Sequence, residues 1–111
     1  MSDLEDTLAM YLDALHIGYQ REVRFAAPRR WRFDFLFADQ VACEVDGGIY
    51  SGGRHTRGAG YEKDAEKFNE AAILGFTVLH VTSTMIASGA AVDYIERALA
   101  ARAKRPQRGT K

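Results

Sequence analysis

The chain has 111 residues, of which 47% are hydrophobic, so it is long enough and apolar enough to bury a core rather than remain disordered. Its net charge is zero. It holds a single cysteine, and this excludes a disulfide framework and a cysteine-based zinc site. No apolar run approaches the roughly 20 residues that span a bilayer and no signal-peptide pattern is present, so we expect one cytoplasmic domain over residues 1–103.

The charges are unevenly distributed along the chain. Residues 21–32 hold five arginines and one acid, and residues 97–111 hold six basic residues and no acid. Acids gather instead in the first predicted helix and over residues 34–70. Basic patches around an acidic centre suit a polyanion that is held at its phosphates near a cation site. The alternative is a solvated surface with a disordered basic tail at residues 104–111.

Apolar periodicity and terminal residues predict three helices and four strands. The first helix begins at a capping box formed by Ser2 and Glu5 and ends at Gly18. The other helices lie at residues 61–74, ended by Gly75, and at residues 90–103. The strands lie at residues 19–25, 31–37, 41–46 and 76–82. This order predicts a single α/β domain. The predicted apolar faces are Leu4, Leu8, Leu12 and Leu15 on the first helix; Trp31, Phe33, Phe35 and Phe37 on the second strand; Tyr61, Ala65, Phe68 and Ala72 on the second helix; and Val92, Ile95 and Leu99 on the third helix.

The second and third strands form a hairpin that brings two acids together. If residues 38–40 form the turn, Phe37 faces Val41, and Asp34 then falls directly opposite Glu44. A slip of one residue would move Asp34 to the opposite face of the sheet and would also mismatch the aromatic face. Asp46 follows Glu44 on the same face, two residues further along the strand.

Converging carboxylates among apolar neighbours need a compensating charge, because burial of an uncompensated polar group costs free energy. Carboxylate oxygens with no histidine beside them suit Mg²⁺ or Mn²⁺, so we predict a metal site at Asp34 and Glu44. The alternative is two acids on a solvated face, which Leu36 and Ala42 on the same face disfavour. Glu5 could reach this cluster or serve only as a cap. Asp46 is either a ligand or an acid at the loop entry.

Basic residues flank the predicted metal site. Lys63 and Lys67 lie one turn apart on the helix after the glycine-rich loop at residues 47–60, and Lys67 is the first candidate to orient water or stabilise charge on a phosphate. His55 in the loop is a candidate general base or phosphate contact, and glycine beside arginine suits a close approach to phosphate. The alternatives are ordinary surface charge and an exposed loop. The loop lacks a GxxxxGK[ST] pattern, which rejects a P-loop.

These residues resemble those of the PD-(D/E)XK nuclease superfamily, which has the restriction-endonuclease-like fold. The stretches FDFLFADQVACEVDGG and KDAEKFNEAAILGFTVLHVT are similar to the small branch around very-short-patch repair endonucleases and related phage and bacterial proteins. The resemblance spans about residues 3–82. It implies an αβββαβ core with a mixed central sheet flanked by helices, followed by a C-terminal helix. It makes Asp34 and Glu44 the metal-binding acids, Glu5 an accessory glutamate and the Val45 carbonyl a further ligand.

One position departs from the family pattern, because Asp46 stands where the family places a lysine. Some members carry that lysine on the next helix, which Lys67 or Lys63 fits, and the repair branch uses a histidine near the metal, for which His55 is the candidate. The resemblance implies a magnesium-dependent DNA endonuclease of a prokaryotic or phage-infected cell, directed by a junction or mismatch rather than by sequence. It leaves open a monomer or a homodimer. The alternatives are a catalytically inactive nucleic-acid-binding subunit and a metal hydrolase that is not a nuclease. The predicted DNA-contacting residues are Arg29, Arg30, Arg32, Arg54, Arg57 and Lys63.

Overall fold

The structure is a computed structural model, and it describes residues 3–47 and 58–104. The loop residues Arg54, His55 and Arg57 therefore lie outside the described residues, as do the capping residue Ser2 and the predicted basic tail from residue 105 onward.

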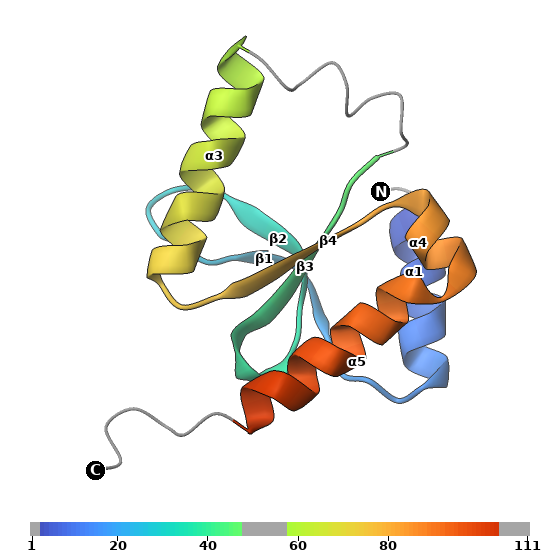
Figure 1. Cartoon of the computed structure of the whole chain (residues 1–111). Coiled ribbons are helices and arrows are strands. Elements are labelled where there is room, and N and C mark those ends of the chain that lie inside the picture. Colours follow the sequence, from blue (N-terminus) through green and yellow to red (C-terminus); the bar gives the residue numbers. More distant parts are fainter. Residues whose placement is uncertain (1–2, 48–57, 105–111) are drawn as a thin grey trace.

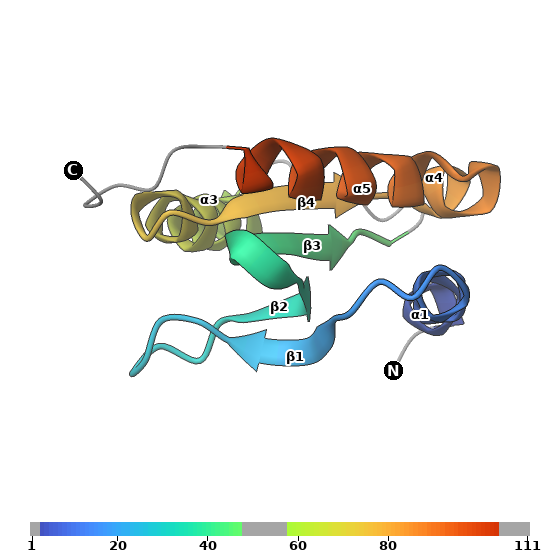
Figure 2. The same ribbon diagram turned by 90° about the horizontal axis from the view of Figure 1, so that it is seen from below.

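A four-stranded sheet forms the centre of the domain. Its strands are β1 (Gln20–Arg24), β2 (Arg32–Leu36), β3 (Val41–Val45) and β4 (Thr77–Val81), and they lie side by side in chain order. The first three strands are antiparallel and β4 runs parallel to β3, as Figure 2 shows from β4 at one edge to β1 at the other. The predicted mixed α/β sheet is thus confirmed.

Helices cover both faces of this sheet (Figure 1). Helix α3 (Gly58–Ile73) connects β3 to β4 and covers one face, and Gly75, with a φ of 94°, follows its end. The other face is covered by α1 (Asp3–Ala14), α4 (Ser83–Ser88) and α5 (Ala90–Ala103). Helix α4 was not predicted from the sequence; it is a short helix capped by the Thr82 hydroxyl, which accepts the Met85 N–H at 3.3 Å. Within the described ranges, no helix is long and apolar enough to cross a membrane.

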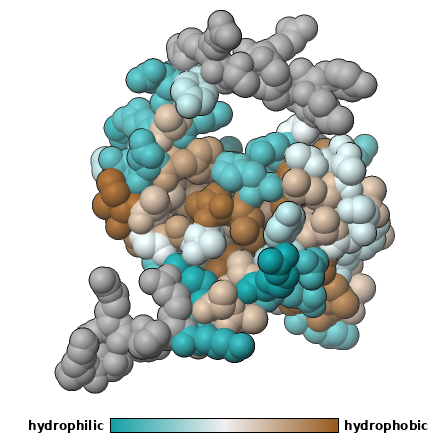
Figure 3. Space-filling model, viewed as in Figure 1, coloured by the Kyte–Doolittle hydropathy of each residue, from teal (hydrophilic) through white to brown (hydrophobic). Residues whose placement is uncertain are grey.

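The core consists of two clusters, one on each face of the sheet. The larger cluster joins the sheet to α1, α4 and α5, and the smaller one, around Phe33, Ala42 and Ala71, joins it to α3. Strand β4 is an edge strand, and apolar surface is visible along it between α3 and α5 (Figure 3). The fully buried residues of the larger cluster are Leu8, Leu12, Phe35, Val41, Cys43, Val81, Ala91 and Ile95.

The prediction that Trp31, Phe33, Phe35 and Phe37 share one face is wrong for Phe33 and also for Trp31, which stacks on Phe25 beside Phe33. Phe35 and Phe37 pack in the larger cluster, whereas Phe33 packs in the α3 cluster. The β1–β2 pairing has Arg21 opposite Phe35 and Val23 opposite Phe33, so the break in alternation falls at Asp34. Glu22, which lies opposite Asp34 in this register, has a φ of 55°. This left-handed residue turns the strand pair between the two aromatic side chains.

Two helical stripes also need correction. Leu15 is 50% exposed because α1 ends one residue before it. Tyr61 is 55% exposed and Ala72 is exposed, because α3 buries Ala71 instead. The predicted inward face of α5 is confirmed, since Ile95 is buried and its apolar neighbours pack against the larger cluster.

Candidate functional site

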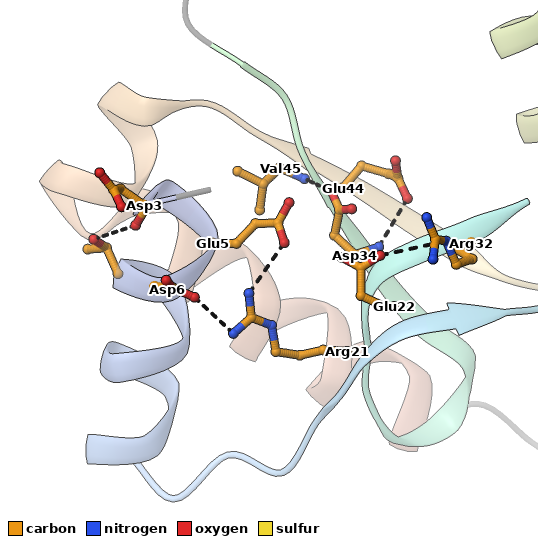
Figure 4. Close-up of polar contacts among 10 residues, drawn as sticks. Asp3, Glu5, Asp6, Arg21, Glu22, Arg32, Asp34, Glu44 and Val45 are labelled. Atoms are coloured by element: carbon orange, nitrogen blue, oxygen red, sulfur yellow. Dashed lines mark hydrogen bonds and ion pairs between the residues drawn. The ribbon is translucent and has the colours of Figure 1, made fainter. Parts of the chain in front are cut away.

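The β2–β3 hairpin has the predicted register. Phe35 pairs with Cys43 and Leu36 pairs with Ala42, which places Asp34 and Glu44 next to each other at the following position. At this position the side chains of the two acids accept backbone hydrogen bonds across the two strands. The Asp34 N–H donates to Glu44 Oε2 at 3.3 Å, and the Val45 N–H donates to Asp34 Oδ2 at 2.8 Å. Figure 4 shows both acids together at this end of the hairpin. The hairpin therefore brings the two predicted metal ligands together.

Glu44 is the more buried of the two acids, and it has a lysine partner. Its side chain is 13% exposed, and Glu44 Oε1 accepts a hydrogen bond from Lys67 Nζ at 3.2 Å. Burial raises the pKa of Glu44 to about 7, although the nearby Lys67 ammonium acts in the opposite direction. Lys63, one turn earlier on α3, is exposed. Of the two candidate lysines, the fold therefore brings Lys67 to the acids.

Asp34 also belongs to a second carboxylate group. Glu5 on α1, Glu22 on β1 and Asp34 on β2 each offer an oxygen atom within 4.8 Å of the others. Burial and then the Asp34 charge raise the pKa of Glu5, while burial raises the pKa of Asp34. Arg21 offsets part of this negative charge by donating to Glu5 Oε1 at 3.3 Å (Figure 4). Glu5 thus reaches the acidic centre, as the sequence allowed.

Glu22 was not among the sequence candidates. It is exposed, and its carboxylate forms a 3.6 Å ion pair with Arg32 Nε. Its place beside Asp34 depends on the pairing of β1 with β2, and no sequence motif marks it. In the charge pattern Glu22 is the single acid of the basic segment 21–32, so the distribution of charge did not point to it either.

Asp46 lies beyond the two central acids and faces the neighbouring strand. Its carboxylate contacts His80 Nδ1 at 3.3 Å, and the His80 ring lies edge-on to Phe68 with centroids 4.7 Å apart. His80 is the β4 neighbour of Glu44 in the parallel register. His55 is the histidine that the sequence pattern indicates, whereas His80 is brought to Asp46 only by the pairing of β3 with β4.

The site offers a divalent ion a suitable set of donors. Asp34 and Glu44 provide oxygen atoms at the end of a hairpin, and carboxylate oxygen is the ligand that Mg²⁺ and Mn²⁺ prefer. Both acids have a raised pKa because burial disfavours their charge, so a nearby cation would stabilise their ionised forms. The donor set and the electrostatics therefore both fit the predicted ion.

Comparisons with known proteins give a likeness in structure. No protein-family model matches the chain, and no curated protein matches it in sequence. A solved structure, the catalytic domain of the homing endonuclease I-Bth0305I, superposes with a TM-score of 0.61 at 20% sequence identity. The superposition covers 92% of this chain and 94% of that domain. The two share a fold. The resemblance to the PD-(D/E)XK superfamily and to its repair-endonuclease branch stays a prediction.

Proposed function

We propose that the chain is a metal-dependent DNA endonuclease that hydrolyses phosphodiester bonds. The observation that carries this proposal is the contact of 3.2 Å between Lys67 Nζ and Glu44 Oε1, at the point where Asp34 also lies. Two acids and a lysine at the end of a hairpin combine cation binding with a donor for a phosphate oxygen. The proposal is also supported by the shared fold, because the structural neighbour is named as an endonuclease catalytic domain.

In this proposal Asp34, Glu44 and the Val45 carbonyl hold Mg²⁺ or Mn²⁺. When bound, the ion supplies Lewis-acid stabilisation of the phosphate and lowers the pKa of a bound water. The Val45 N–H fixes the Asp34 carboxylate by a 2.8 Å hydrogen bond, so this ligand is already oriented. Glu5 belongs to the same acidic centre as an accessory residue, and Asp46 at the end of β3 is a further candidate ligand.

In this proposal Lys67 acts in place of the lysine that the PD-(D/E)XK pattern has at the position of Asp46. Its ammonium group has three N–H donors, of which Glu44 accepts one. Within residues 3–47 and 58–104 no other acceptor for these donors is present, so they can stabilise negative charge on the phosphate that is attacked. The side chain is only 15% exposed, so it is held close to Glu44 rather than spread into solvent.

The DNA backbone would be held by basic residues around this site. Arg29, Arg30 and Arg32 lie at or near the β1–β2 turn, and Lys63 is exposed on α3. Arg54, His55 and Arg57, which lie outside the described residues, stay predicted contacts of the same kind. We propose a substrate defined by a junction or mismatch rather than by sequence.

The proposed function is tested with branched, mismatched and plain duplex DNA, each incubated with Mg²⁺, with Mn²⁺ or with EDTA. Cleavage that requires the metal is the expected result. Binding without cleavage on every substrate would favour the inactive nucleic-acid-binding protein instead. Hydrolysis of small phosphodiesters without affinity for DNA would favour a hydrolase of another class.

The substitution Lys67→Met is expected to lower the cleavage rate about a hundredfold, since a positioned donor to the transition state is lost. Binding of Mn²⁺ should be retained or become tighter, because the substitution removes a cation from Glu44. Single-turnover cleavage and Mn²⁺ titration by calorimetry measure the two effects. Lys104→Met, which removes an exposed lysine after α5, is the matched control. Loss of Mn²⁺ binding in Lys67→Met would show that the lysine supports the fold of the site.

A further inference from the structure

The turn between β1 and β2 carries a stacked column of aromatic rings. Phe33, which is fully buried, stacks on Phe25 with ring centroids 4.0 Å apart. Phe25 stacks on Trp31 at 6.2 Å, and the Arg29 guanidinium lies 4.3 Å above the Trp31 ring. The column therefore extends from the α3 side of the core to an arginine whose side chain is 53% exposed.

Two contacts fix the orientation of Arg29. The face of its guanidinium lies on Trp31, and Arg29 Nη2 donates to Glu66 Oε2 on α3 at 2.6 Å. A guanidinium has five N–H donors, so donors stay available for another anion. Because the planar group is already held in place, little conformational entropy is lost when it binds a phosphate.

This arginine is connected to the candidate active site by two elements. Glu66, which holds Arg29, and Lys67, which contacts Glu44, are consecutive residues of α3. The second connection is β2, which begins directly after Trp31 and has Asp34 as its third residue. Arg29 is thus linked to the candidate site through adjacent residues of α3 and through β2.

The column favours a phosphate over a base as its ligand. Stacking of an unpaired base requires a free aromatic face. The Trp31 ring already contacts Phe25, and the Arg29 guanidinium lies over it at 4.3 Å from its centroid, so an incoming base would have to displace Arg29. The surrounding arginines, Arg24 and Arg32, are opposite each other in the β1–β2 pairing and add positive charge to the same hairpin.

We propose that Arg29 is a preorganised clamp for a backbone phosphate of duplex DNA, and that the phosphate displaces Glu66 from it. This inference rests on the proposed function, because it assigns the DNA path beside the same site. Trp31 keeps the guanidinium in place when Glu66 is displaced, whereas Glu66, as an anion, competes with the incoming phosphate. Removing Arg29 and neutralising Glu66 must then have opposite effects on DNA affinity.

The test measures binding of a fluorescently labelled plain duplex by anisotropy, in EDTA, over a series of salt concentrations. Arg29→Ala is expected to weaken binding about tenfold and to reduce the slope of log K against log salt by about 1. Glu66→Gln is expected to tighten binding several-fold. Since the chain has a single tryptophan, the emission of Trp31 reports the same contact, and the duplex should change it in the wild-type protein but not in Arg29→Ala.

The chain offers matched controls for both substitutions. Arg97 on α5 also contacts a carboxylate, Asp93 at 3.3 Å, and lies 5.7 Å over an aromatic ring, Tyr94. Arg97→Ala should reduce the salt slope less than Arg29→Ala does, because α5 covers the face of the sheet opposite to α3. Glu70→Gln, which neutralises an exposed acid one turn after Glu66, should have a smaller effect than Glu66→Gln. Thermal unfolding confirms that each variant folds.

The proposal is overturned if Arg29→Ala and Arg97→Ala reduce the slope equally, since the effect would then be one of net charge. It is also overturned if Glu66→Gln weakens binding, or if a single-stranded oligonucleotide changes Trp31 emission more than the duplex does. All measurements are made without metal, so they do not depend on cleavage. If the protein cleaves DNA in Mg²⁺ but Arg29→Ala does not change DNA binding, the clamp proposal is wrong and the endonuclease proposal stands. If Arg29→Ala changes binding as expected but no substrate is cleaved, the endonuclease proposal is wrong and the clamp proposal stands.

Discussion

Replacing Glu44 by glutamine is expected to lower the rate of metal-dependent DNA cleavage about a thousandfold, the scale of losing a principal source of electrostatic stabilisation at the reacting phosphate. Glutamine preserves the size of the side chain and can still accept the Asp34 N–H, which Glu44 Oε2 accepts at 3.3 Å. It removes the charge that would bind the ion. The measurement is single-turnover cleavage of the best substrate in Mg²⁺, together with Mn²⁺ titration of the same variant.

A charge-matched control separates this effect from a change in net charge. Glu96→Gln removes one exposed carboxylate from α5, which contributes no residue to the candidate site, and should cleave at the wild-type rate. If Glu44→Gln retained both cleavage and Mn²⁺ affinity, Glu44 would not be a metal ligand. Among the residues that the structure describes, the acidic centre of Glu5, Glu22 and Asp34 would then be the candidate place for an ion.

The pairing of Asp34 with Glu44 was predictable from sequence because local rules determine it. Alternation along two short strands and a turn of three residues leave one register, and the pairing of Phe35 with Cys43 confirms it. The helices whose ends are marked by capping residues or glycines were predictable for the same reason. Local sequence therefore gave the fold class and the position of the two central acids.

Other parts of the site depend on contacts between distant segments. Glu22 comes to Asp34 only because β1 pairs with β2 across a loop whose length does not impose a register. The change of side between Phe35 and Phe33 coincides with the left-handed φ of Glu22, which is unusual for a residue other than glycine and is not encoded in any hydrophobic pattern. His80 reaches Asp46 through the parallel pairing of β3 and β4. The rotation of α3, which brings Lys67 rather than Lys63 to Glu44, is likewise set by packing.

The metal-free protein is expected to lose stability as the pH rises from 5 to 8. Burial raises the pKa of Glu44 from 4.5 to about 7, so between these values the folded protein binds a proton that the unfolded chain has released. The free energy of unfolding must then fall as the pH increases, by about 3 kcal/mol for this group over the full range. The raised pKa values of Glu5 and Asp34 act in the same direction. Urea unfolding in EDTA at several pH values measures the slope.

Two comparisons assign this pH dependence to the candidate metal site. Glu44→Gln should remove most of the slope, because the group that titrates is gone, whereas Glu96→Gln should retain it. Mg²⁺ or Mn²⁺ should stabilise the wild-type protein at pH 8 and have little effect at pH 5, since a ligand stabilises the state that binds it and the proton competes for the same carboxylate. A stability that stays level or rises between pH 5 and 8 would mean that the Lys67 ion pair outweighs the burial of Glu44. In that case the acid would be stable as an ion pair in the metal-free protein, and a cation would have to displace Lys67 in order to bind.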